Sequence, residues 1–389
     1  MNAGQTVFSQ LLQFFPMGEF RRAVARYGGN HRTRSLSCHD QFLAMAFAQL
    51  TCRDSLRDIV ACLGALGPRV YHAGLRGRVA RSTLADANDR RDWRIYAEVA
   101  QVLIARARTL YAGEALLDEL RGAVFALDSS VISLCLKLCP WARFDAAGAA
   151  IKIHTLLDLR GSIPSVVAIT PARVPDVGML DRLAFEPGAT YIMDRAYLDF
   201  ARLDRVDAAG AFFVVRSKSN VRLRTVARRP VEHHTGLLHD HTVRTLTPTA
   251  RRHYPGNLRR VRYYDAVHDN DLMFLTNHMD LPALTIADLY RLRWQVETFF
   301  RWIKQHLRIK AFYGTSDNAV RTQIWIALIV YLLVAIARKQ LRIDAPLVTI
   351  LQVASISLFE KITLKTALTQ SHYNEKPPAN CKQLELFDF

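Results

Sequence analysis

The sequence has few cysteines and no long apolar run. Its six cysteines, among 389 residues, include no C-x2-C pair, so we do not expect a zinc ribbon or finger. We expect reduced cysteines in a cytoplasmic protein. The longest apolar run, residues 324–337, has 14 residues, fewer than the ~20 of a membrane span. The first residues show no signal peptide. We therefore expect a cytoplasmic protein without a membrane segment, in which 324–337 is a helix buried against a sheet.

Acidic residues are scarce relative to basic ones. Asp and Glu number 35 against 52 Lys and Arg, which gives a net charge of +17. An excess of this size favours a polyanionic partner. An anionic membrane surface is the competing partner, but the sequence offers no span. We therefore expect a nucleic-acid-binding protein, long enough for two or three domains.

Two of the scarce acids follow apolar runs. Asp128 ends the run 123–127, and Asp194 ends the run 191–193. We interpret both as acids at the tips of buried strands, where side chains converge on a site. The alternative is that each one only caps a helix or a turn.

A third carboxylate lies within the pattern Y-x2-R-x3-E-x6-K. Its members are Tyr290, Arg293, Glu297 and Lys304. On one continuous helix, which a capping box of Thr285 and Asp288 would begin, they fall within about 60° of arc. A carboxylate among cations suits a metal ion and phosphates. The alternative is a solvated helix face with intrahelical ion pairs.

Together these segments resemble the DDE transposases of bacterial insertion sequences, in the group marked by the YREK signature (the insertion-sequence-four family). The matching residues are 127–130 (LDSS), 193–197 (MDRAY), Tyr290, Arg293, Glu297 and Lys304. The resemblance spans about residues 120–315. One departure is Ala196, where the family commonly has glycine, and it concerns the backbone conformation after Asp194.

The resemblance implies an RNase H-like DNA transposase that cuts the ends of an insertion sequence and joins them to target DNA, by cut-and-paste through a hairpin. Asp128, Asp194 and Glu297 would hold two Mg²⁺ or Mn²⁺ ions, which serve each displacement at phosphorus. Phosphate contacts would come from Tyr290, Arg293, Lys304, Arg195 and Lys310. The implied partners are the terminal inverted repeats, the target DNA and a second copy of the chain, in the bacterial cytoplasm at the nucleoid.

Residues 1–115 are expected to form a helical DNA-binding domain. Helices are predicted over 41–50, over 56–63, and from 83 towards 110 with Ser82 as N-cap. Lys and Arg outnumber Asp and Glu 16 to 8 in residues 1–110. Arg81, Arg90 and Arg91 near a helix start fit a helix-turn-helix-like reader of DNA. A plain helical bundle with a basic face is the alternative.

Residues 116–217 are expected to form the first part of an α/β catalytic core. Predicted strands cover 122–127, 151–157, 165–170, 189–193 and 211–217, with helices over 176–185 and 199–209. This order predicts an RNase H-like mixed sheet flanked by helices. Asp128 and Asp194 would lie on neighbouring strands, and a covering helix in the second part, 277–365, would deliver Glu297.

Residues 218–276 are expected to be a β-rich insertion. Residues 218–262 hold eleven Lys and Arg, two Asp and Glu and five His. Residues 242–246 and 261–264 alternate like strands. The insertion contains no Trp, so Tyr254, Tyr263 and Tyr264 are the candidates for stacking on an extruded base. A basic loop is the alternative.

Residues 366–389 are expected to be a flexible tail. It contains Gln383, Leu384, Leu386 and Phe387, a pattern that resembles the peptide by which bacterial proteins dock on the replication sliding clamp. The alternative is a tail that folds back onto the protein. Two other functions also stay open: a different RNase H-like DNA nuclease, and a catalytically inactive, transposase-derived DNA-binding protein.

Overall fold

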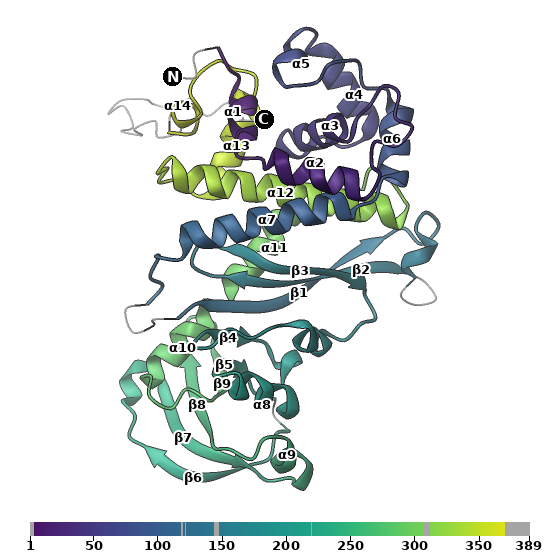
Figure 1. The fold of residues 1–389 in the computed structure, drawn as a ribbon. Helices are drawn as coiled ribbons and strands as arrows, with labels where there is room; N and C mark the ends of the chain where they lie inside the picture. The colour runs from purple at the N-terminus through teal and green to yellow at the C-terminus, as the bar shows by residue number, and fades with distance from the viewer. Residues whose placement is uncertain are drawn as a thin grey trace, which may run out of the picture.

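The computed structural model describes residues 4–117, 120, 122–143, 148–218, 220–306 and 312–369. Its centre is a nine-stranded mixed sheet with the order β3-β2-β1-β4-β5-β9-β8-β7-β6. Helices cover the sheet, and a helical region extends from one side of it (Figure 1).

The first five strands form one side of the sheet, in the order β3-β2-β1-β4-β5. They are β1 (Val124–Leu134), β2 (Ala149–Asp158), β3 (Ile163–Pro171), β4 (Thr190–Met193) and β5 (Phe212–Arg216). β1, β2 and β3 form an antiparallel meander. β4 pairs parallel to β1, and β5 pairs parallel to β4. Each of these strands overlaps a predicted one, and the mixed sheet flanked by helices is confirmed.

Both faces of this core are buried. Val124 and Ala126 of β1 pack into one hydrophobic cluster with the long helices. Phe125 and Leu127 pack into a second cluster on the other face, together with α8 (Phe200–Ala208) and the 3-10 turns η2 (Asp176–Arg182) and η3 (Arg195–Tyr197). The near-continuous apolar run before Asp128 therefore reflects a strand that is covered on both sides.

The insertion extends the same sheet instead of forming a separate one. Its strands are β6 (Leu223–Arg229), β7 (Leu237–Thr245), β8 (Leu258–Asp265) and β9 (Asn270–Thr276), with α9 (Pro248–His253) and the turn η4 (His233–Thr235) between them. β9 pairs antiparallel to β5. The predicted strands at 242–246 and 261–264 correspond to β7 and β8.

The helical region shares its core with the C-terminal helices. It contains α1 (Val7–Leu12), α2 (Met17–Arg26), α3 (Cys38–Leu50), α4 (Leu56–Ala65), α5 (Arg69–His72), α6 (Arg81–Arg90) and α7 (Arg94–Tyr111). The prediction of one helix from 83 towards 110 was wrong, because the chain turns between α6 and α7. Ser82 lies inside α6, whose N-cap is Ala80.

The apolar run 324–337 lies in α12 (Asp317–Gln340). This helix is long and apolar enough to cross a membrane, but 94% of its most apolar window is buried inside the protein. It packs mainly on α7, α3 and α6, and also contacts β3. α13 (Leu347–Ser357) and α14 (Leu364–Thr369) follow it. The prediction of a buried helix is confirmed, with helices as its principal neighbours.

Candidate active site

Asp128 lies on β1, and Asp194 directly follows the end of the adjacent strand β4. Leu127 of β1 is paired with Met193 of β4 in parallel register, and each aspartate is the next residue. Asp194 follows the end of β4, as predicted. The prediction that a strand ends at Asp128 was wrong: β1 continues to Leu134, because its second half pairs with β2, where Thr155 is the partner of Asp128.

The pattern that contains Glu297 lies on two helices, α10 (Ala283–Arg291) and α11 (Trp294–His306). The prediction of one continuous helix was wrong. Between them the amide of Arg293 donates to the carbonyl of Tyr290 at 3.0 Å, a three-residue spacing tighter than that of an α-helix. The prediction of a capping box was also wrong, because α10 begins after Pro282 and its N-cap makes no side-chain hydrogen bond.

The two helices bring the signature residues to the aspartates. The hydroxyl of Tyr290 donates to Oδ1 of Asp194 at 3.3 Å. Arg293 donates through Nη1 to Oδ2 of Asp128 at 3.0 Å and through Nη2 to Glu297. Nζ of Lys304 donates to the carbonyl of Val131 on β1 at 2.9 Å. The guanidinium of Arg293 therefore joins two of the three carboxylates.

Three carboxylates are a donor set that suits hard divalent cations. In the described part of the chain, no three His, Cys, Asp or Glu residues are grouped closely enough to hold a metal ion. Arg293 supplies the positive charge between Asp128 and Glu297 instead. The side chain of Asp128 is 21% exposed, whereas that of Glu297 is 50% exposed. Burial raises the pKa of Asp128 to about 6, although the Ser129 amide and Arg293 oppose the shift. The three carboxylates fit a metal ion if the guanidinium of Arg293 moves away from Asp128 and Glu297.

Ser129, which lies in the motif 127–130, supports Asp128 together with Asp176 and Lys152, two residues that the sequence reasoning missed. The amide of Ser129 donates to Oδ1 of Asp128 at 2.8 Å, and its hydroxyl donates to Asp176 at 2.7 Å. Asp176 also pairs with Nζ of Lys152 at 2.9 Å. The Lys152 side chain is only 11% exposed, so its charge needs this partner. A lysine inside the predicted strand 151–157 was the available signal.

Several predicted DNA contacts are placed by the structure. Arg195 is exposed in η3, immediately after Asp194. Ala196 lies in the same 3-10 turn, whose backbone angles any L-residue adopts, so glycine is not required there. Arg81 and Arg90 are exposed at the two ends of α6. Lys310 and the tail residues Gln383, Leu384, Leu386 and Phe387 lie outside the described residues.

Arg91 has a structural role. Its guanidinium donates to the carbonyls of Ser37 and Leu36 and to Oε1 of Gln41. These acceptors lie at the start of α3, which Arg91 thereby ties to the chain between α6 and α7. Its donors are thus engaged within the helical region, unlike those of Arg81 and Arg90.

The tyrosine candidates in the insertion differ in exposure. Tyr254 is 1% exposed, and its hydroxyl donates a hydrogen bond to Asp207 at 2.8 Å. The prediction that Tyr254 could stack on a base was therefore wrong. Tyr263 packs against Arg291, which lies 5.6 Å from the ring centroid. Tyr264 is 39% exposed and bonds Asp269. The large exposed aromatic nearest the carboxylates in sequence is instead Trp294, which follows Arg293 and is 56% exposed.

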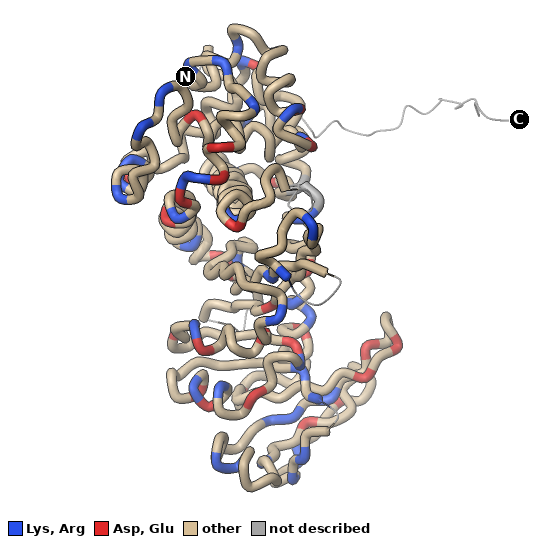
Figure 2. The backbone as a smooth tube through the Cα atoms, turned by 90° about the vertical axis from the view of Figure 1, so that its right-hand side faces the viewer, with Lys and Arg blue, Asp and Glu red and all other residues tan. Residues whose placement is uncertain are grey.

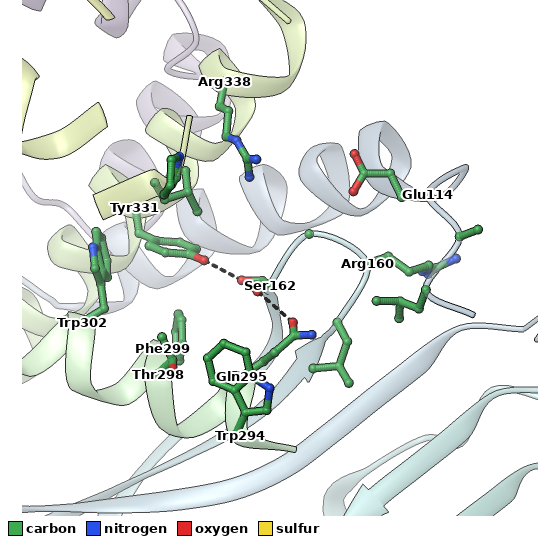
Figure 3. Close-up of a pocket in the computed structure, with 16 residues that line it drawn as sticks. Glu114, Arg160, Ser162, Trp294, Gln295, Thr298, Phe299, Trp302, Tyr331 and Arg338 are labelled. Atoms are coloured by element: carbon green, nitrogen blue, oxygen red, sulfur yellow. Dashed lines mark hydrogen bonds between the residues drawn. The ribbon is translucent and has the colours of Figure 1, made fainter. Parts of the chain in front are cut away.

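Trp294 also lines a cavity of about 470 Å³ beside α11. The other lining residues of α11, Gln295, Thr298, Phe299 and Trp302, form one face of that helix (Figure 3). On the opposite wall the hydroxyl of Tyr331 donates to the carbonyl of Ser162 at 2.6 Å. None of the three carboxylates lines this cavity.

Comparisons with known proteins identify a family and several relatives. Residues 119–333 match the family model described as a transposase DDE domain. Residues 3–76 match a domain of unknown function, DUF4372. Among solved structures, a piggyBac transposase synaptic complex with hairpin DNA matches with a TM-score of 0.47 and 10% identity, over 96% of this chain and 83% of that one.

Curated relatives carry related names. A Sinorhizobium fredii protein named as a transposase, y4zB, is 38% identical over 72% of this chain and 77% of its own length. A Geobacillus stearothermophilus protein named as the transposase for insertion sequence element IS5377 is 32% identical, over 53% of this chain and 54% of its own length. A Synechocystis protein named as the transposase for insertion sequence element IS4SA is 23% identical, over 67% of this chain and 72% of its own length.

Proposed function

This chain belongs to the family of DDE transposases, and we propose that Asp128, Asp194 and Glu297 are its catalytic carboxylates. The family consists of enzymes that cut DNA and transfer strands, and normally use divalent metal ions. The observation that carries the assignment is the parallel register of β1 and β4, with Arg293 linking Asp128 to Glu297. These contacts support the proposal that three acids far apart in the sequence act at one site.

The carboxylates would hold two Mg²⁺ or Mn²⁺ ions. When bound, such ions activate an attacking oxygen and stabilise a leaving one at phosphorus. Arg293 would move from Asp128 and Glu297 to the DNA phosphates, because a metal ion replaces the charge it supplies. Tyr290 would keep Asp194 oriented through its hydroxyl, and Lys304, anchored on β1 beside the site, would contact the backbone of the bound end.

We further propose that the enzyme acts on the terminal inverted repeats of its own element and on target DNA, through a hairpin at the cut end. Two copies would hold two ends in the cytoplasm, at the nucleoid. Arg195 and Lys310 would add phosphate contacts. Trp294, exposed beside Arg293, would stack on an unpaired base near the cut. The helical residues 1–115 and the insertion 218–276 would bind flanking DNA.

The C-terminal tail supplies a separate proposal. Its residues Gln383, Leu384, Leu386 and Phe387 would dock on the replication sliding clamp, with Leu386 and Phe387 as apolar anchors. Replacing both anchors with alanine should abolish retention of the protein on immobilised clamp. Retention equal to that of the wild type would show that Leu386 and Phe387 do not dock the tail on the clamp.

The cleavage proposal is tested on a duplex that carries the element's end, with Mg²⁺ or Mn²⁺ and a denaturing gel. We expect nicked, hairpin and joined products with the wild type and none of them with Asp128→Asn, which should still bind the duplex. Cleavage without joined product would favour a nuclease. Binding without cleavage would favour an inactive, transposase-derived DNA-binding protein.

A further inference from the structure

The insertion contains one charged pair that is buried and therefore cannot contact DNA. In Figure 2 the insertion, at the end of the molecule away from the N-terminus, carries many basic and acidic positions. Among its described Asp, Glu, Lys and Arg residues, only Asp240 on β7 and Arg259 on β8 are buried, with side chains 5% and 3% exposed. A buried ion pair seldom adds net stability over an apolar pair. Asp240 and Arg259 therefore call for a role besides stability.

The guanidinium of Arg259 divides its donors between two partners. Nε and Nη2 donate to the two carboxylate oxygens of Asp240 at 2.8 and 2.7 Å. Nη1 donates instead to the backbone carbonyls of His278, at 3.2 Å, and of Leu281. Arg229 of β6 donates to a third carbonyl, which lies between these two in the chain. Two arginines of the insertion thus hold the backbone of residues 278–281.

This stretch of backbone leads directly into α10. The helix begins after Pro282, and its N-cap makes no side-chain hydrogen bond. At the other end of the stretch, the ring of His278 stacks on Phe212 of β5, with centroids 3.8 Å apart. Nε2 of the same histidine lies 3.2 Å from Oγ1 of Thr190 on β4. The start of α10 is therefore placed by β4, by β5 and by Arg259.

The position of α10 matters for the acidic site. The helix contacts both β4 of the core and β8 of the insertion (Figure 1). The ring of Tyr290, in its last turn, packs on Phe274 of β9 at 4.6 Å between centroids, and its hydroxyl donates to Asp194. Arg293 follows two residues after the helix ends. Because catalytic groups tolerate only small displacements, a shift of α10 would misplace both side chains.

We propose that Arg259 is a positioning residue of the cleavage reaction. Its Nη1 holds the start of α10, and through that helix it aligns Tyr290 and Arg293 with the carboxylates. Asp240 has a different task, because it neutralises and orients Arg259 without touching residues 278–281. This inference rests on the proposed function, and it gives the insertion a part in the reaction besides the DNA binding proposed for it.

Two variants of the full chain separate positioning from stability. Arg259→Lys keeps a positive charge for Asp240, but a single ammonium cannot replace the fork of the guanidinium, so the carbonyls of residues 278–281 lose a donor. Asp240→Asn removes the charged partner but leaves Nη1 on those carbonyls. Both variants should lower the Tm, because both disturb a buried ion pair. Only Arg259→Lys should release α10.

The first measurement is hydrogen exchange of the α10 amides without DNA. We expect Arg259→Lys to raise the exchange rate of residues 283–291 at least ~10-fold, through local opening of the helix. Asp240→Asn should leave that rate at the wild-type value. Arg91→Lys is the matched control, because Arg91 holds carbonyls at the start of α3 in the same way; it should leave α10 unchanged.

The second measurement is cleavage of a duplex that carries the element's end, at saturating DNA and with Mg²⁺. Arg259→Lys should cleave about 10- to 100-fold more slowly than the wild type, with its affinity for the duplex unchanged. Asp240→Asn and Arg91→Lys should keep the wild-type rate per folded molecule, although their Tm falls. A merely structural pair would instead give losses of rate that follow the losses of Tm.

Wild-type exchange of α10 in Arg259→Lys would overturn the proposal, and so would a wild-type cleavage rate in that variant. Equal losses of rate in Asp240→Asn and Arg259→Lys would also overturn it, because the pair would then act only through stability. Failure of the wild type to cleave would instead count against the proposed function. The exchange of α10 would still decide whether Arg259 holds the helix.

Discussion

The guanidinium of Arg293 donates a 3.0 Å hydrogen bond to the carboxylate of Asp128, which lies 165 residues earlier in the chain. The same guanidinium also contacts Glu297, one helical turn later. The arginine thus supplies, in this structure, the positive charge between two of the proposed metal ligands. The site is best understood as one in which an internal cation and metal ions compete for the same carboxylates.

This competition predicts that Arg293→Ala binds Mn²⁺ more tightly than the wild type at pH 8. We expect a gain of roughly 10-fold, equivalent to about 1.4 kcal/mol, because two carboxylates lose their internal partner. Cleavage should nevertheless fall, since a phosphate contact is lost. Calorimetric titration with Mn²⁺ measures the first effect. Weaker Mn²⁺ binding would show that Arg293 assembles the carboxylates instead of competing for them.

Ser129 should position Asp128 through Asp176. Ser129→Ala removes the 2.7 Å hydrogen bond to Asp176 but keeps the amide that bonds Asp128. We expect cleavage at saturating DNA to fall about 10-fold or more, the usual range for residues that orient metal ligands, with unchanged DNA affinity. Ser129→Thr, which keeps the hydroxyl, should restore the rate. Equal rates for the alanine variant and the wild type would show that Asp128 needs no such support.

Trp294 should contribute to DNA binding without affecting metal binding. It is 56% exposed beside Arg293, and stacking on a base is worth about 1–3 kcal/mol. Trp294→Ala should therefore bind the cut end roughly 5- to 150-fold more weakly, while Trp294→Phe keeps part of the affinity. Fluorescence anisotropy with a labelled duplex measures this. Tyr254→Phe is the control, because Tyr254 is buried and bonds Asp207; it should leave affinity unchanged.

Acid should destabilise the fold through His278. Burial lowers the pKa of His278 to about 4, below its ordinary value of about 6.5. The folded state therefore binds fewer protons than the unfolded state between these values. Stability is greatest above pH ~6.5 and falls as the pH is lowered towards 4, by about 2 kcal/mol between pH 6.5 and 5. His278→Gln cannot titrate, so its Tm should fall less over this interval. Parallel Tm curves for the two proteins would contradict this assignment.

The sequence predicted the features that depend on local pattern. The apolar runs before Asp128 and Asp194 indicated neighbouring buried strands, and the structure pairs them in register. The break between α10 and α11 was not predictable from periodicity, because the apolar positions continue across Leu292 and Arg293. The contact of Asp176 with Ser129 joins residues 47 positions apart, and only the tertiary fold creates it. Tyr254 was a candidate for stacking on a base, but packing against Phe213 of β5 buries it.

The central claim is that Asp128, Asp194 and Glu297 form one metal site. The most direct measurement is a Mn²⁺ titration followed by electron paramagnetic resonance, on the wild type and on Asp128→Asn, Asp194→Asn and Glu297→Gln. We predict that each single substitution weakens Mn²⁺ binding by at least ~10-fold while the protein stays folded and binds DNA. Three variants that bind Mn²⁺ like the wild type would contradict the claim.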